Sequence, residues 1–126
     1  MPVQIVNKIL NINYEENFGV AFGLAKGGLV IFIILNLIII GVILKMLFKS
    51  NQNQKPIKQK CFILISAGGI GNLIDRIFRG YVIDYIDFSQ IINFPIFNFA
   101  DICIVIGTIG IAVYAILEII KGKEVG

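Results

Sequence analysis

The chain has 126 residues, of which 57% are hydrophobic and 15% are charged, and its net charge is +3. Soluble domains average about half apolar and about a quarter charged residues, so this composition excludes a disordered chain and a nucleic-acid-binding protein. It favours a membrane protein over a soluble globule. The length suits one compact unit, and we predict a single integral-membrane domain over residues 1–126.

The absence of histidine excludes several kinds of catalytic site. A Ser-His or Cys-His nucleophile pair, a zincin motif and a His-ligated metal all need an imidazole. Cys61 and Cys103 lie in separate apolar runs and are predicted to be free core thiols. We therefore expect neither a metal nor a cofactor, and any hydrolytic chemistry has to come from carboxylates or from a hydroxyl paired with lysine.

Residues 1–27 are predicted to form a β segment. Apolar and polar residues alternate from Leu10 to Tyr14, which is the period of a half-buried strand, and a glycine-containing turn follows over residues 17–23. No apolar run here is long enough to span a membrane or to act as a signal peptide. If this segment lies outside the cytoplasm, a hydrophobic helix has to precede it, so we expect a first span to be missing from the chain.

Two segments are predicted to be transmembrane helices from length and hydropathy alone. Residues 28–48 begin with a long uncharged run and reach roughly 30 Å as a helix, the thickness of a bilayer core. Residues 98–120 are similarly apolar, with Asp101 near the beginning and Glu118 near the end.

A third span is predicted over residues 61–78, although its uncharged part reaches only about 21 Å. Its far end carries Asn72, Asp75 and Arg76, so these groups have to be buried against protein rather than lipid. A cluster of small residues precedes them and predicts close helix packing: Ala67, Gly68, Gly69 and Gly71.

The lysines predict the orientation in the membrane. The loop between the first two spans carries five lysines and no acid, at positions 45, 49, 55, 58 and 60, which is typical of a cytoplasmic loop. Two crossings later, the tail with Lys121 and Lys123 is also predicted to be cytoplasmic. Residues 1–27 and 79–97 are then extracytoplasmic.

All four aspartates fall at the predicted extracytoplasmic end: Asp75, Asp84, Asp87 and Asp101. Placing a charged carboxylate at the boundary of the lipid costs free energy, so carboxylates found there suggest a functional site. Two that approach each other share a proton and so supply one acid and one base at neutral pH. Asp84 and Asp101 are the best pair, because each adjoins a membrane segment or its return loop, and together they would activate water for amide hydrolysis.

Other interpretations of these residues remain open. Asp75 has a structural role if it pairs with Arg76 or Arg79, and Asn98 is either a helix N-cap or a substrate-orienting residue. A hydroxyl nucleophile paired with lysine would use Ser66 or Ser89, but most lysines lie on the opposite side. A small proton or cation transporter subunit would carry its carboxylates along the depth of the spans, whereas these gather at one end.

Three sequence blocks carry a resemblance that covers essentially the whole chain. They are NYEENFGVAFG (13–23), GGIGNLIDRIFRGYVIDYIDF (68–88) and FNFAD (97–101). They resemble the N-x-G-A-A-F, G-N-x-x-D-R-x-x-x-G-x-V-x-D-F and F-N-x-A-D blocks of the lipoprotein signal peptidases, or signal peptidase II, which are aspartyl peptidases of the bacterial inner membrane. Val20 replaces the first Ala of A-A-F, and the family's first transmembrane helix has no counterpart.

The resemblance implies a fold, a reaction and a set of site residues. It implies four helices with a small extracytoplasmic β cradle, of which three helices are present here, in a monomeric multi-pass protein surrounded by membrane lipids. Its substrate would be a prolipoprotein, cut before a diacylglyceryl-modified cysteine, and a truncated inactive form is the alternative. The catalytic pair corresponds to Asp84 and Asp101, and Asp75 with Arg76 corresponds to a structural pair. The residues that surround the dyad and hold the substrate correspond to Asn17, Gly68, Asn72, Arg76 and Asn98.

Overall fold

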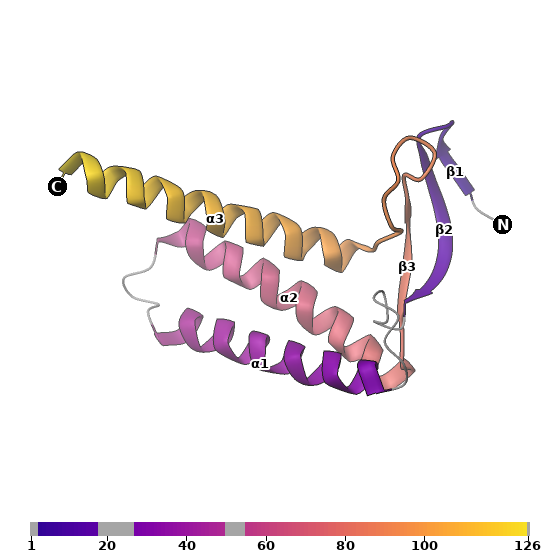
Figure 1. The fold of residues 1–126 in the computed structure, drawn as a ribbon, viewed down its shortest axis with the longest axis horizontal. Helices are drawn as coiled ribbons and strands as arrows, with labels where there is room; N and C mark the ends of the chain where they lie inside the picture. The colour runs from indigo at the N-terminus through magenta and orange to yellow at the C-terminus, as the bar shows by residue number, and fades with distance from the viewer. Residues whose placement is uncertain (1–2, 18–26, 50–54, 126) are drawn as a thin grey trace.

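Three long helices and a small sheet make up the computed structural model, which describes residues 3–17, 27–49 and 55–125 (Figure 1). All three helices are long and apolar enough to cross a membrane. This confirms the predicted fold class, a membrane helix bundle with a small β element. In chain order the elements are β1 (Val3–Val6), β2 (Leu10–Asn17), α1 (Gly27–Lys49), α2 (Pro56–Arg79), β3 (Val82–Asp87) and α3 (Phe99–Val125).

The helices are longer than the sequence predicts, most of all α2. It begins at Pro56, a residue suited to the first helical position because its missing N–H has no partner there. The helix therefore begins five residues before the predicted span over residues 61–78. With 24 residues the helix reaches about 36 Å and spans a bilayer without difficulty. Lys58 and Lys60 are compatible with a position near the membrane surface, since a long side chain carries its charge outward.

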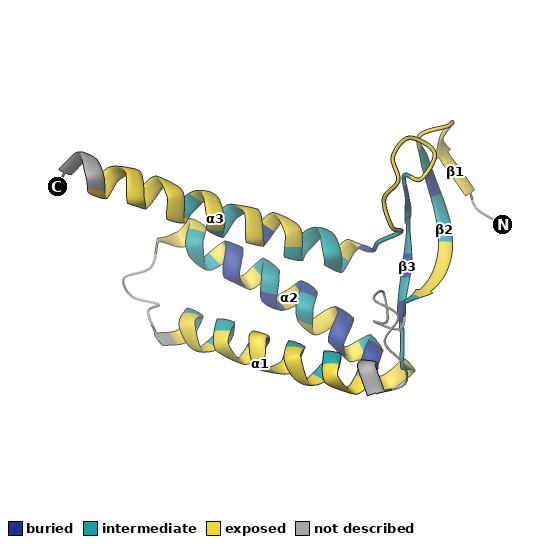
Figure 2. Cartoon of the chain, in the orientation of Figure 1, coloured by how far each residue is buried: buried dark blue, intermediate teal, exposed yellow. Residues whose placement is uncertain are grey.

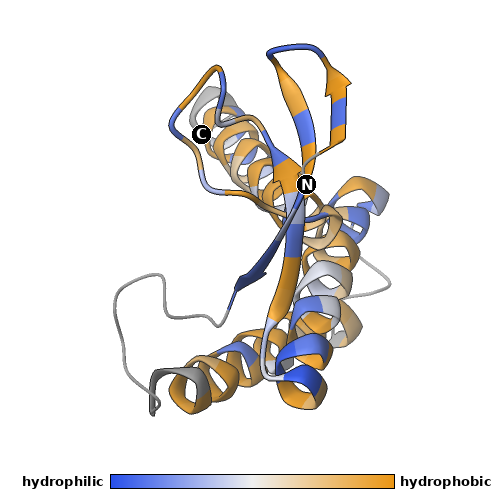
Figure 3. Cartoon of the chain, turned by 90° about the vertical axis from the view of Figure 1, so that its right-hand side faces the viewer, coloured by the Kyte–Doolittle hydropathy of each residue, from blue (hydrophilic) through white to orange (hydrophobic). Residues whose placement is uncertain are grey.

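Helix α2 lies between α1 and α3 and carries most of the buried helical residues (Figures 1 and 2). Its small residues allow this close packing, as predicted. A Cβ at Gly68 would collide with the backbone carbonyl oxygen of Ala100 in α3, and a Cβ at Gly69 would lie 3.3 Å from Cδ1 of Ile40 in α1. The outer faces of α1 and α3 are largely exposed and hydrophobic (Figure 3), as expected of surfaces in contact with lipid.

The sheet is antiparallel, with β2 between β1 and β3. The strand predicted at Leu10 to Tyr14 is present and continues to Asn17, because its second half pairs with β3. The register places Glu15 opposite Asp84, and it shifts between Ile12 and Glu15. The turn predicted over residues 17–23 lies outside the described residues, except for Asn17.

The sheet stands at the end of the bundle where α1 and α3 begin and α2 ends (Figure 1). Gly80 makes the connection from α2 to β3 short. Its φ of 82° lies in the left-handed region, and its N–H donates to the carbonyl oxygen of Arg76 at 3.0 Å, as in a glycine helix cap. At the opposite end of the bundle, α2 carries its lysines. Both cysteines are free; Cys61 is buried and Cys103 is half-buried.

Candidate active site

Asp84 enters the site from the middle of β3. Successive strand residues point to opposite faces, so Val82 and Asp84 share a face. Among the described side chains they are the most deeply buried, at 1% and 2% exposure. Burial raises the pKa of the Asp84 carboxyl, and the charges of Asp101 and Glu15 act in the same direction. Hydrogen bonds from Asn17 and Asn98 oppose the shift without reversing it. Asp84 therefore holds a proton more tightly than an ordinary aspartate.

Asp101 enters from the first turn of α3, where Asn98 caps the helix. The N–H of Asp101 donates to Oδ1 of Asn98 at 3.0 Å, and the N–H of Asn98 donates to Oδ2 of Asp101 at 3.1 Å. This reciprocal pair is a capping box. These two hydrogen bonds fix the position of the Asp101 carboxylate at the start of α3.

The return loop from β3 brings the first turn of α3, with Asp101, to the same cavity as Asp84. Phe97 pairs with Ile86: their backbone groups exchange hydrogen bonds of 2.8 and 3.1 Å. The ring of Phe97 packs against two other rings of this segment. It stacks on Phe88, with the ring centroids 6.1 Å apart, and it meets Phe94 edge-on, with the centroids 5.7 Å apart. Asn98 follows directly, so the first turn of α3 starts beside Asp84.

Two asparagine amides connect the carboxylates. Nδ2 of Asn98 donates to Oδ1 of Asp84 at 2.9 Å and to Oδ1 of Asn72 at 3.0 Å. Nδ2 of Asn72 donates in turn to Oδ1 of Asp101 at 2.8 Å. On its other side, Asp84 accepts a hydrogen bond from Nδ2 of Asn17 at 3.0 Å. Residues from β2, α2, β3 and α3 thus form one partly buried polar network around the two acids.

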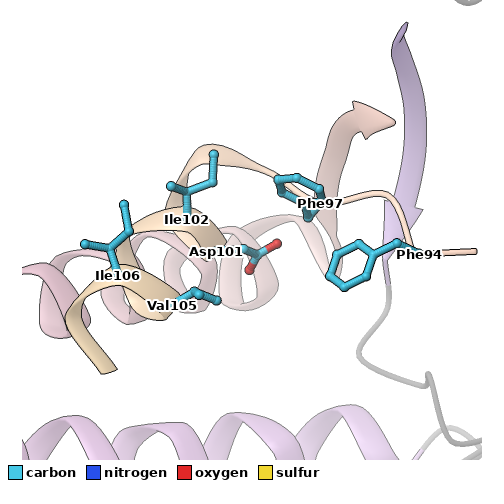
Figure 4. A pocket seen from close by; sticks show the side chains of 6 residues that line it. All are labelled: Phe94, Phe97, Asp101, Ile102, Val105 and Ile106. Atoms are coloured by element: carbon cyan, nitrogen blue, oxygen red, sulfur yellow. The ribbon is translucent and has the colours of Figure 1, made fainter. Parts of the chain in front are cut away.

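Both carboxylates line a single cavity of about 340 Å³. Next to it lies a smaller apolar pocket of about 220 Å³ along α3, in which the Asp101 carboxylate faces two phenylalanine rings (Figure 4). The two spaces share Asp101, Phe94, Phe97 and Val105, so the acidic site opens onto a hydrophobic surface. The cavity around the acids is lined by Asn17, Asp84, Phe94, Pro95, Ile96, Phe97, Asp101, Ile104 and Val105.

The structure separates Arg76 from the ion pair on α2. Asp75 lies 4.0 Å from Nε of Arg79, and both side chains are substantially exposed. Arg76 is buried, with Cζ 4.4 Å from the ring centroid of Phe32. Coulomb attraction acts on it from Asp101 first, then from Asp84 and Asp75. Arg76 therefore lies within the electrostatic influence of the two site acids as well as of its sequence neighbour.

The sequence-predicted residues thus fall into a connected group and a supporting group. Asp84, Asp101, Asn17, Asn72 and Asn98 are joined by hydrogen bonds. Gly68 lies one turn before Asn72, in the tight contact between α2 and α3. For the alternative nucleophile, Ser66 Oγ is buried and has no hydrogen-bond partner in the part of the chain that is described.

Sequence reasoning did not single out the aliphatic wall of the cavity. Ile104 and Val105 lie three and four residues after Asp101, and this spacing places all three on one helix face. The helical period was therefore the signal that could have found them.

The chain matches the model of the family described as "Signal peptidase (SPase) II" over residues 1–117. The chain belongs to the signal peptidase II family. A lipoprotein signal peptidase of Fusobacterium nucleatum subsp. nucleatum is 43% identical over 111 residues, covering 88% of this chain and 67% of that protein. The lipoprotein signal peptidase of Caldicellulosiruptor bescii is 40% identical over 123 residues, covering 98% and 76%.

The fold is also similar to solved structures of membrane enzymes. Two bacterial membrane enzymes determined by the in meso method superpose with TM-scores of 0.73 and 0.75, at 33% and 32% identity. The superpositions cover 94% and 91% of this chain and 71% and 74% of those proteins. Together with the three membrane-spanning helices, these matches identify a multi-pass membrane protein of a peptidase family.

Proposed function

We propose that this chain is an aspartyl endopeptidase that removes signal peptides from prolipoproteins, cutting before a diacylglyceryl-modified cysteine. The proposal rests chiefly on one observation: Asp84 and Asp101 line the same cavity and are joined through Asn98 and Asn72. Two acids in such a position can activate water without a nucleophilic side chain. The names of the relatives support the choice of substrate.

The two acids take different roles in the proposed mechanism because their surroundings differ. Burial raises the pKa of Asp84, so we assign it the role of proton donor. Asp101 accepts hydrogen bonds from Asn72 and from the N–H of Asn98, which hold its carboxylate in place for the role of base. Asp101 removes a proton from water as the water oxygen attacks the scissile carbonyl carbon. Asp84 then donates its proton to the departing amine nitrogen as the C–N bond breaks.

The hydrophobic pocket beside the acids suits a lipid-modified substrate. Its wall is formed by aliphatic side chains of α3 and by two rings of the return loop (Figure 4). A substrate could keep its acyl chains in hydrocarbon while its peptide reaches Asp101 from the side. We place the site at the extracytoplasmic face of the inner membrane, since the lysine-rich ends of α1 and α2 lie at the other end of the bundle.

Replacing either acid by its amide tests the mechanism. Asp84→Asn and Asp101→Asn preserve side-chain size but remove a proton donor or acceptor, so we expect each to lower kcat at least about a hundredfold. The assay is cleavage of a diacylglyceryl-cysteine peptide by the purified protein in nanodiscs.

Asp87→Asn is the matched control for these two variants. Asp87 lies on the same strand as Asp84, and its Oδ1 accepts from the N–H of Ser89 at 2.8 Å, which an amide oxygen can also do. It should keep wild-type turnover. Wild-type turnover in Asp84→Asn or Asp101→Asn would rule out the aspartyl mechanism, and an uncut lipopeptide with wild-type protein would rule out the substrate assignment.

A further inference from the structure

Arg76 is held in the protein without an obvious hydrogen-bond partner at its Nε. The residue is 8% exposed, and Nε is buried with no acceptor among the residues that the structure describes. The carboxylates of Asp101, Asp84 and Asp75 attract its charge. Attraction toward several acids holds a cation nearby but does not fix the plane of a guanidinium, because Coulomb forces lack the directionality of hydrogen bonds. Some other contact has to orient it.

The ring of Phe32 in α1 supplies that contact. Cζ of Arg76 lies 4.4 Å from the ring centroid, within the range in which a guanidinium is attracted to an aromatic face. The interaction is stronger where water is excluded, as it is around this buried arginine. Because α2 lies between α1 and α3 (Figure 1), Phe32 reaches Arg76 from α1, whereas Asp101 attracts it from α3.

The local structure of α1 keeps Phe32 facing α2. Phe32, Asn36 and Ile40 are spaced by four residues, so they form one stripe on the helix. Ile40 approaches α2 closely at Gly69, where a Cβ would lie 3.3 Å from Cδ1 of Ile40. Nδ2 of Asn36 donates to the carbonyl oxygen of Phe32 at 2.8 Å, which satisfies this amide donor within α1. Two cross-helix contacts along one stripe fix the rotation of α1 about its axis.

We propose that Phe32 is a positioning residue of the site: its ring orients the Arg76 guanidinium toward the two carboxylates. Helix α1 contributes to the site in this way although it supplies neither acid. The catalytic consequence rests on the proposed peptidase function, whereas the positioning itself can be measured without any substrate.

The positioning is tested by NMR of the arginine side chains. Arg76 and Arg79 are the only two arginines, so protein labelled with ¹⁵N-arginine gives two Nε–Hε signals. A proton above an aromatic face is shielded, and we expect the Arg76 signal upfield of the Arg79 signal. Phe32→Leu should remove this displacement, Phe32→Tyr should keep it, and Arg79 should stay unchanged as the internal reference.

The catalytic consequence is tested by lipopeptide cleavage, with kcat normalised to folded protein. We expect Phe32→Leu to lower kcat about tenfold with KM unchanged, and Phe32→Tyr to restore it. Phe48→Leu is the matched control: it makes the same change on the same helix, at a ring that is 69% exposed, and should leave both kcat and the NMR signals unchanged.

Two results would overturn the proposal. One is an Arg76 signal that does not move in Phe32→Leu, and the other is a Phe32→Leu protein with wild-type kcat. A Phe32→Tyr protein as impaired as Phe32→Leu would also count against it, since the aromatic face is retained. If wild-type protein does not cut the lipopeptide, the proposed function fails, and the NMR comparison still decides whether Phe32 positions Arg76.

Discussion

Asn98 shows how a single side chain can serve both the helix and the site. Its Oδ1 caps α3 by accepting from the N–H of Asp101, while its Nδ2 donates to Asp84 and Asn72. The two interpretations of this residue, a helix cap and a residue oriented toward the site, are therefore compatible geometrically. Because the same side chain bonds to groups on β3, α2 and α3, it fixes where α3 starts relative to Asp84. The separation of the two acids therefore depends on this side chain.

The pKa of Asp84 predicts a pH-dependent stability with a definite sign. Because burial raises this pKa in the folded protein, the protonated carboxyl favours folding. This stabilisation is complete below the unfolded pKa and is lost as the pH rises through the folded pKa. Asp84→Asn does not titrate, so the Tm of wild type minus that of Asp84→Asn should fall as the pH is raised from 3 to 8, by about a few degrees.

Asp87 provides a comparison with the opposite sign. Hydrogen bonds from Ser89 lower the pKa of Asp87, so its stabilisation is present above the unfolded pKa and is lost as the pH falls through the folded pKa. The Tm of wild type minus that of Asp87→Asn should therefore rise with pH over the same range. Thermal unfolding in detergent measures both series, and equal slopes would contradict the difference in environment.

At the scale of the elements, the contact between α2 and α3 positions Asn72 for Asp101. Glycines on both helices make this contact close. A Cβ at Gly107 in α3 would lie 2.6 Å from the carbonyl oxygen of Cys61 and 2.7 Å from Cγ1 of Ile65 in α2. Small residues of this kind allow membrane helices to approach closely, so the hydrogen bond of 2.8 Å between Asn72 and Asp101 depends on glycines farther along the bundle.

Gly107→Ala should destabilise the protein and lower its activity. The added methyl group meets a backbone carbonyl, which cannot move without separating the helices, and overpacking of this kind costs about 1–3 kcal/mol. We expect a lower Tm and a lower kcat in the lipopeptide assay. Gly41→Ala in α1 is the matched control, because no atom lies within 4 Å of its added Cβ. Alanine there should raise Tm slightly, and an equal loss in both variants would contradict the packing argument.

At the scale of the whole molecule, the two ends of the bundle differ in chemistry. The sheet, the return loop and the two acids occupy one end, and the lysine-rich ends of α1 and α2 occupy the other (Figure 1). A hydrolytic site at one membrane face can meet a substrate whose lipid stays in the bilayer. The separation of lysines from acids along the helices thus fits both the predicted topology and the proposed reaction.

Cysteine labelling tests this orientation. In a background that carries Cys61→Ala and Cys103→Ala, Gln90→Cys in the return loop should react with an impermeant maleimide added outside spheroplasts. Lys121→Cys near the end of α3 should react only after the cells are broken. Both native residues are exposed, so access depends on the side of the membrane. The reverse labelling pattern would invert the proposed topology.

Local patterns in the sequence determined much of this protein. A membrane span depends on the sum of hydropathy over about 20 neighbouring residues, so all three helices could be predicted, with errors only at their ends. The sidedness prediction needs only the positions of the lysines. The choice of Asp84 and Asp101 followed from their placement at one end of the spans and from the three family-like blocks.

Only the tertiary structure decided which side chains meet. The residues alone left the partner of Asp75 open between two arginines, and the family resemblance implied Arg76. The fold instead placed Arg79 in the ion pair and Arg76 against Phe32. The helical period places Ile104 and Val105 on the same face as Asp101, but it does not say what that face meets. The pairing of β2 with β3 likewise has no local signal that fixes its partner. Such contacts join residues distant in the chain, and they form only when helix packing and strand register bring those residues together.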